Sequence, residues 1–132
     1  MRAHRTIKSW HEMVAAKDLS KLGDFLDENA VFKSPMAHTP YPGKFAVYFA
    51  LSNVLEVFEN FNYHREFIAD DGRSAVLEFT ADVSGKSLKG VDIITFDEDG
   101  LITEFEVLIR PMSGLTALAA QMAPRMAKMS KQ

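Results

Sequence analysis

At 132 residues the chain is long enough for one domain with a real core, and its net charge of −3 excludes a basic surface for nucleic acid or anionic membranes. The absence of cysteine excludes disulfides, thiolate catalysis and cysteine-based zinc sites. No segment approaches the ~18 apolar residues of a membrane span, and the N-terminus lacks the apolar core of a signal peptide. We therefore expect a single domain over residues 1–132 that is soluble and cytoplasmic.

The first third of the chain predicts helices followed by a short strand. Apolar residues recur at three- and four-residue intervals over residues 7–14 and again over 19–26, with a break near residue 17. This spacing predicts two short helices, with Asp18 or Ser20 capping the second. The single tryptophan, Trp10, lies on the first helix, where a core anchor is its simplest role. Residues 30–35 are expected to form a strand that Pro35 ends.

Residues 36–43 form the main irregular stretch, because three of the five prolines lie within it or next to it. Such loops often carry recognition residues. His38 and Tyr41 lie here, and the ordinary pKa of histidine is close to neutrality. His38 is therefore either a general base or ligand contact, or an ordinary solvated loop residue.

The rest of the chain alternates between helical and strand patterns. An aromatic-rich helix is expected from Gly43 to about Glu59, followed by strands over residues 61–69 and 74–84. The last segment, residues 112–132, has leucines and methionines at helical spacing and is expected to kink or end near Pro124. Its methionines suit either an adaptable ligand lid or plain core packing. Because there is no phosphate-binding glycine loop and no metal-ligand spacing, we expect no cofactor and no metal.

Residues 90–111 predict a long β-hairpin, because two apolar runs meet at a turn that ends in Asp99 and Gly100. Alternation places Asp92 on the same face as Ile94 and Phe96. A carboxylate in an apolar row either lies at a wet edge or is held in a cavity, where burial raises its pKa and makes it a candidate acid or hydrogen-bond donor.

These elements predict an α+β domain: a curved antiparallel sheet wrapped around the N-terminal helices, forming a cone with an apolar interior pocket. Alternation assigns one face of the sheet to the interior; its residues are Leu77, Phe79, Ala81, Asp92, Ile94, Phe105, Val107 and Ile109. The opposite face carries several apolar side chains among charges, which favours a homodimer through the outer sheet face; these are Val76, Val91, Ile93, Ile102 and Leu108.

The order of elements resembles the cystatin-like cone of the nuclear transport factor 2 superfamily, which includes ketosteroid isomerase, SnoaL-type polyketide cyclases, scytalone dehydratase and limonene epoxide hydrolase. The most specific marks are D-I-I-T-F-D-E-D-G-L-I at residues 92–102 and N-A-V-F-K-S-P at residues 29–35. The resemblance covers almost the whole chain. It implies the fold more firmly than it implies an activity, because this fold hosts many chemistries.

The resemblance places Asp92 on the isomerases' oxyanion-hole aspartic acid, a carboxylic acid that the family keeps neutral. It places Trp10 on their oxyanion tyrosine and Ser34 on their general-base aspartate, while the supporting tyrosines correspond to apolar residues near Leu26 and Leu51. These departures argue against true ketosteroid isomerase activity. Limonene-type epoxide hydrolysis needs an arginine beside the aspartate, where this chain has Gly90 and Ile94.

These observations favour two functions, and a third is weaker. The first is a SnoaL-like cyclase, isomerase or dehydratase acting on a small hydrophobic carbonyl compound, with Asp92 as acid or hydrogen-bond donor and with Trp10 and His38 assisting. The second is a non-catalytic ligand-binding or dimerisation domain, and the third is a protein-binding adaptor. The expected ligand-binding residues line the cone; these are Ser34, Tyr41, Leu77, Phe79, Phe105, Val107 and Ile109.

Overall fold

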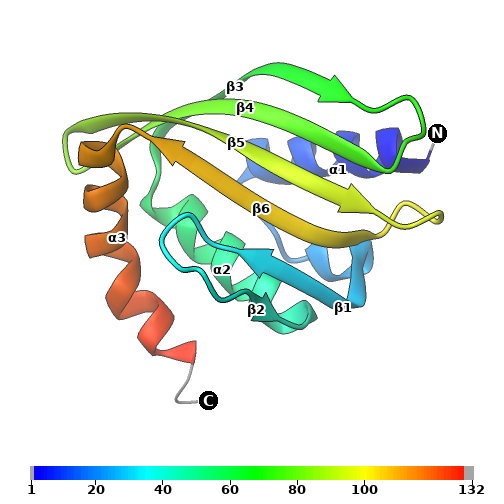
Figure 1. The fold of residues 1–132 in the computed structure, drawn as a ribbon, viewed down its shortest axis with the longest axis horizontal. Helices are drawn as coiled ribbons and strands as arrows, with labels where there is room; N and C mark the ends of the chain where they lie inside the picture. Colours follow the sequence, from blue (N-terminus) through cyan, green and yellow to red (C-terminus); the bar gives the residue numbers. More distant parts are fainter. Residues whose placement is uncertain (1, 130–132) are drawn as a thin grey trace.

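The structure is a computed structural model that describes residues 2–129. Its elements follow the expected α+β order (Figure 1). In chain order they are α1 (Arg2–Ala16), the 3₁₀ helix η1 (Leu22–Phe25), β1 (Leu26–Lys33), β2 (Tyr41–Pro42), α2 (Lys44–Val57), β3 (Glu59–Ile68), β4 (Ser74–Val83), β5 (Lys86–Phe96), β6 (Ile102–Arg110) and α3 (Met112–Ala127).

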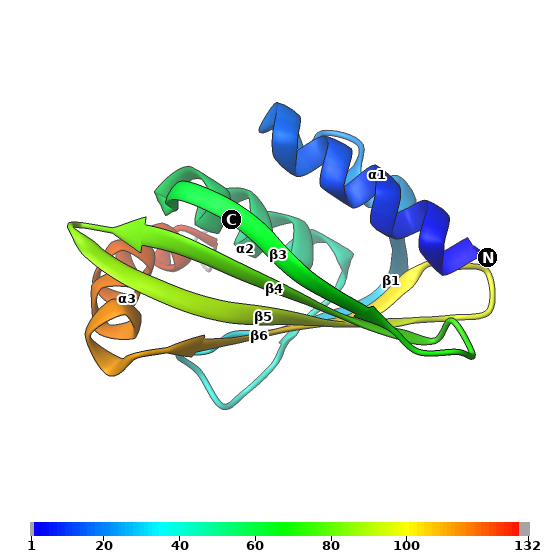
Figure 2. The ribbon, with the colours of Figure 1, turned by 90° about the horizontal axis from the view of Figure 1, so that it is seen from above.

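The described strands form one curved, unclosed sheet in the order β2-β1-β6-β5-β4-β3. All neighbouring pairs are antiparallel except β1 with β6, which run parallel. Figure 2 shows α1 and α2 lying over one face of the sheet, while α3 covers the end where β6 finishes. The core lies between this inner face and the helices. No helix within residues 2–129 is both long enough and apolar enough to cross a membrane.

The N-terminal region differs from the expected pair of helices. Only α1 is a full helix, and the second segment shortens to the single turn η1. Leu26, expected in that helix, instead begins β1 and pairs with Ile102 of β6. The apolar spacing arose because Leu19, Leu22 and Leu26 all point into the core from a compact turn and a strand start. Asp18 accepts a hydrogen bond from the Ser20 backbone N–H at 3.0 Å, so it stabilises the turn rather than a helix.

The β5–β6 hairpin has the expected turn but a shifted register. Gly100 has φ of 85°, and its N–H donates to the Asp97 carbonyl oxygen at 3.0 Å. An irregularity then pairs Phe96 with Ile102, whereas Thr95 pairs with Glu104. The extra residue reverses the alternation at the start of β6. Ile102 is consequently buried in the core, and its expected place on the outer face is wrong.

The last helix continues through Pro124 to Ala127 and does not end at the proline. It packs against α2 and against the ends of β4, β5 and β6. Arg125, one residue after the proline, reaches Glu56 Oε1 at 2.6 Å and Asn53 Oδ1 at 3.2 Å, both on α2. These contacts hold α3 beside α2, where it closes one end of the cone.

Gly90 on β5 leaves no room for a side chain between the neighbouring strands β4 and β6. A Cβ atom there would lie 2.6 Å from both the Leu108 carbonyl oxygen and the Phe79 ring, and 2.9 Å from the Ile109 side chain. Backbone cannot move away as a flexible side chain can, so only glycine fits at this point between β4 and β6.

We expect Gly90→Ala to lower the free energy of unfolding by about 1–3 kcal/mol, because the added methyl group overpacks the core. Chemical denaturation measures this change. Gly23→Ala is the matched control, since its Cβ would meet only the Lys44 Cε atom at 3.5 Å. Equal stability for the two variants would show that the sheet relaxes around residue 90 without cost.

Candidate active site

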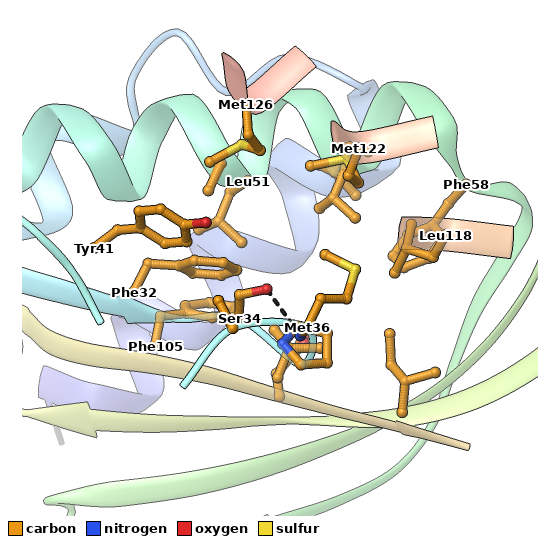
Figure 3. Close-up of a pocket in the computed structure, with 18 of the residues that line it drawn as sticks. Phe32, Ser34, Met36, Tyr41, Leu51, Phe58, Phe105, Leu118, Met122 and Met126 are labelled. Atoms are coloured by element: carbon orange, nitrogen blue, oxygen red, sulfur yellow. Dashed lines mark hydrogen bonds between the residues drawn. The ribbon is translucent and has the colours of Figure 1, made fainter. Parts of the chain in front are cut away.

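A cavity of about 240 Å³ lies between the inner face of the sheet, α2, α3 and the loop after β1 (Figure 3). Aromatic and aliphatic side chains make up most of its wall, which includes Phe32, Phe58, Phe61 and Phe105. Among the described residues, Asp92 is the one lining side chain with a carboxyl group, and no lysine, arginine or histidine lines the cavity. Residues 2–129 also contain no cluster suited to a metal ion. The cavity is therefore an apolar chamber with a single acidic group.

Asp92 is fixed in the middle of the sheet. It pairs with Leu77 on β4 and with Val107 on β6, and it is 5% exposed. Its Oδ2 atom accepts a hydrogen bond from the Tyr63 hydroxyl at 2.6 Å. No residue within 2–129 makes a hydrogen bond to its other oxygen, Oδ1. One carboxyl oxygen is thus anchored, and the other remains available to a ligand.

Burial raises the pKa of Asp92 to about 7, and the Tyr63 hydrogen bond opposes part of that rise. The cause is desolvation, since removing a carboxylate from water disfavours its charged form. Near neutral pH the side chain is therefore divided between the acid and the carboxylate. A group with this pKa can donate or accept a proton with little free-energy cost, which suits general acid–base catalysis.

Tyr63 joins Asp92 to the first helix. Its hydroxyl oxygen accepts a hydrogen bond from Trp10 Nε1 at 2.8 Å while its proton is directed at Asp92. Burial, followed by the nearby Asp92 charge, raises the pKa of Tyr63 well above its usual range, so the phenol keeps its proton. Trp10 is further held by an edge-to-face contact with Phe105, with ring centroids 5.3 Å apart. The result is a directional chain from Trp10 through Tyr63 to Asp92.

Sequence reasoning missed Tyr63 as a site residue. The alternation of β3 does place Tyr63 on the same face as Phe61. Its hydrogen bond to Asp92, however, joins β3 to β5 across β4, and it can be recognised only once these three strands are paired. Simple alternation along β3 does not continue beyond Tyr63, because the register with β4 shifts before Glu66. This shift turns Phe67 outward, where it is 56% exposed.

The structure brings most of the expected site residues together. With Asp92, the cavity is lined by Trp10, Ser34, Tyr41, Phe105, Val107 and Ile109. Ser34 lies just past β1, and its Oγ atom accepts a hydrogen bond from the Met36 backbone N–H at 3.0 Å, as Figure 3 shows. That bond leaves the Ser34 hydroxyl proton free to point elsewhere.

Three expected residues lie apart from the cavity. Leu77 and Phe79 are fully buried and do not line it. The rings of Phe58 and Phe61 pack against Phe79 at 5.5 and 5.1 Å and form the wall in its place. His38 is exposed and is not among the lining residues. In this structure His38 is a surface loop residue.

Comparison with known proteins connects this geometry to a family. A family model described as a SnoaL-like domain matches residues 7–105. A solved structure of a steroid delta-isomerase from Pseudomonas aeruginosa is 50% identical, with a TM-score of 0.94, covering 100% of this chain and 96% of that one. No curated protein sequence matches significantly.

Two further structures share the fold. An uncharacterised bacterial protein with a cystatin-like fold from Silicibacter pomeroyi is 34% identical, with a TM-score of 0.89, covering 97% of this chain and 89% of that one. The epoxide hydrolase/cyclase-like enzyme SalBIII, from pyran ring formation in salinomycin, is 16% identical with a TM-score of 0.68, covering 86% of this chain and 97% of that one. At that identity the likeness shows the fold alone.

We expect Tyr63→Phe to raise the pKa of Asp92 above about 7, because the hydrogen bond that favours the charged carboxylate is lost while burial remains. A carboxyl-carbon NMR titration measures this directly. Tyr41→Phe is the control, because it removes another hydroxyl from the cavity wall that makes no hydrogen bond to Asp92. An unchanged Asp92 titration in Tyr63→Phe would contradict the role assigned to this bond.

Proposed function

The chain belongs to the SnoaL-like domain family, and from this premise we propose that it is an isomerase-type enzyme acting on a neutral, hydrophobic carbonyl compound, with Asp92 as the acid or hydrogen-bond donor. One observation carries the proposal. A buried carboxyl group, anchored on one oxygen and free on the other, faces an apolar cavity of about 240 Å³.

The chemistry follows from the electrostatics of this carboxyl group. When Asp92 is protonated, it can donate a hydrogen bond to a carbonyl oxygen through its free side. Negative charge developing on that oxygen is stabilised more strongly in a water-poor cavity than in bulk solvent. As the α-proton of a substrate with a nearby carbon–carbon double bond leaves to a water molecule, the Asp92 proton moves to the carbonyl oxygen and an enol forms. The proton then returns from that water to another carbon, and the enol O–H proton returns to Asp92, so the double bond shifts and the acid is restored. Such proton transfer is common to isomerase, cyclase and dehydratase reactions.

The steroid delta-isomerase likeness supports the reaction type, but this chain departs from the isomerase pattern at two positions. Ser34 stands where the resembling isomerases have a general-base aspartate, and it cannot carry a negative charge at neutral pH. The Trp10 N–H is already bonded to Tyr63 and is not free to reach a substrate oxygen. Asp92 is therefore the proposed catalytic residue, while Trp10 and Tyr63 position it. The exposed His38 has no part in this proposal.

The alternative is a ligand-binding domain without catalysis. The missing second acid–base group, which weakens the isomerase analogy, favours this alternative. Among the described residues, Asp92 is the one carboxyl group in the cavity lining, and its pKa is about 7. A binder would use the Asp92 hydrogen bond to hold a carbonyl compound and would release it unchanged.

We expect Asp92→Asn to slow turnover by roughly 10²–10⁴-fold, the usual contribution of one positioned acid–base group. The probe reaction is deuterium incorporation next to the carbonyl of tetralone, a neutral two-ring ketone, followed by proton NMR in heavy water. Because the protonated form is the donor, the wild-type rate should fall as the pH rises through about 7.

Asp70→Asn is the matched control, since Asp70 is exposed in the turn between β3 and β4. An Asp92→Asn variant as fast as the wild type would remove the catalytic proposal. If the wild type binds tetralone but adds nothing to the exchange rate, the non-catalytic alternative stands for this class of ligand.

We also propose that the outer face of the sheet forms a homodimer interface. Apolar side chains gather there on neighbouring strands, with Val76 beside Ile93 and Val91 beside Leu108. Leu108 is 49% exposed in the single chain. Apolar side chains gathered on a sheet face that no described helix covers are typical of a protein contact.

We expect Leu108→Glu to convert a dimer into a monomer, because it places a charge within this patch, and light scattering after size exclusion measures the mass. Phe45→Glu is the control, since Phe45 is a comparably exposed apolar residue at the start of α2, on the helix side of the sheet. A wild-type mass of one chain would overturn the interface proposal.

A further inference from the structure

We propose that the substrate is a flat compound of two fused rings with one carbonyl group, and that Leu118, Met122 and Met126 of α3 set this size limit. The inference rests on the proposed function, because the carbonyl group is the part that Asp92 would bind. It goes further by assigning a size and shape to the ligand and by identifying the wall that fixes them.

The size follows from the cavity volume. Apolar cavities of about 150 Å³ hold one benzene ring, which has six carbons. On that scale two fused rings need about 250 Å³, and the four fused rings of a steroid need about 425 Å³. The cavity volume of about 240 Å³ matches two rings. A four-ring molecule would have to leave its distal rings in solvent.

The shape follows from the aromatic walls. Phe32 and Phe105 lie nearly parallel, at 30° with centroids 6.4 Å apart, and both line the cavity. Phe58 and Phe61 form a second nearly parallel pair, at 24° and 5.4 Å. Two aromatic pairs thus make up much of the wall, and aromatic rings pack favourably against the ring of a flat aromatic ligand in offset-stacked or edge-to-face geometry.

The charge of the ligand follows from the lining. Asp92 is the acidic group of the lining, and no lysine, arginine or histidine within residues 2–129 lines the cavity, so a ligand carboxylate would enter an apolar chamber without a cationic partner. A neutral oxygen acceptor avoids this cost and pairs with the protonated carboxyl. The ligand is therefore a ketone or related neutral carbonyl compound rather than an acid.

The limiting wall belongs to α3. Leu118 and Met122 are almost fully buried and Met126 is partly buried, and all three reach the cavity (Figure 3). The helix that carries them is tied to α2 by the Arg125 contacts with Glu56 and Asn53, and to Ser84 by Gln121 at 3.3 Å. Because these contacts tie α3 both to α2 and to the turn between β4 and β5, we expect the wall to stay in place when a ligand enters, so that its side chains decide how long a ligand can be.

The test is a binding series with neutral ketones of one, two and four rings: cyclohexenone, tetralone and androstenedione. Trp10 is the single tryptophan of the chain and lines the cavity, so its fluorescence reports binding. We expect tetralone to bind at least roughly tenfold more tightly than cyclohexenone, because four more carbons are buried. Androstenedione should bind no more than about threefold more tightly than tetralone, since its extra rings stay outside.

Met122→Ala should extend the cavity and raise the affinity for androstenedione relative to tetralone by roughly tenfold. Met126→Ala is a second variant at a less buried site of the same wall, in case the first does not fold, which circular dichroism checks. Met112→Ala is the matched control, because Met112 is on the same helix, is 81% exposed and does not line the cavity. It should leave the ratio unchanged.

Androstenedione binding more than threefold more tightly than tetralone to the wild type would overturn the size limit. Folded Met122→Ala and Met126→Ala variants that keep the wild-type ratio would overturn the role of α3. Both tests measure binding affinity and are independent of turnover. A catalytic failure, with Asp92→Asn as fast as the wild type, would leave the affinity ratios and the size limit intact while removing the proposed function.

Discussion

The site depends on holding one carboxyl group out of water. An ionised carboxylate without a partner is costly in an apolar interior, so Asp92 remains there by being neutral for much of the time and by accepting a hydrogen bond from the Tyr63 hydroxyl at 2.6 Å. Tyr63 is in turn held by the Trp10 N–H at 2.8 Å. Each bond satisfies a buried polar group that would otherwise be unpaired. The helix α1, the edge strand β3 and the central strand β5 are therefore coupled at the same point where the chemistry is proposed.

The two faces of the central strands show how a neighbouring cation decides the protonation state of a buried carboxyl group. Asp92 on the inner face is 5% exposed and Glu78 on the outer face is 6% exposed. Glu78 lies against the side chains of Arg65 at 2.6 Å and Lys89 at 3.2 Å, and the Arg65 hydrogen bond is the main reason that its pKa falls to about 2. No cation within residues 2–129 contacts Asp92, and burial raises its pKa to about 7. One sheet thus carries a permanent charge outside and an exchangeable proton inside.

The membership in the SnoaL-like family explains the cone but not the contents of its cavity. The sheet curves over α2, and α3 closes the end, so an interior space follows from the architecture. Its chemistry follows from a few residues: a carboxyl group on β5, a serine after β1, and methionines on α3. By the resemblance to the isomerases, Ser34 stands where their general-base carboxylate is expected, and it is a neutral hydroxyl. The proposed reaction type and ligand size accordingly rest on these side chains, and the fold supplies their positions.

Periodicity and turn chemistry alone determined the α+β order, the hairpin at Gly100 and the inward direction of Asp92, because these are local features of strand alternation and backbone conformation. The same reasoning failed where non-local pairing overrode it: Leu26 became a strand residue by pairing with β6, and Ile102 turned inward at an irregularity in β6. It also placed Leu77 and Phe79 in the cavity wall, where Phe58 and Phe61 lie instead. The Tyr63 hydrogen bond depended on the packing of three strands, and the cavity volume on where α3 docks. Distances between residues far apart in the chain are set only by the tertiary structure. Asp92 could therefore be identified as a candidate from the sequence, whereas its hydrogen-bond partner Tyr63 and the cavity walls around it could not.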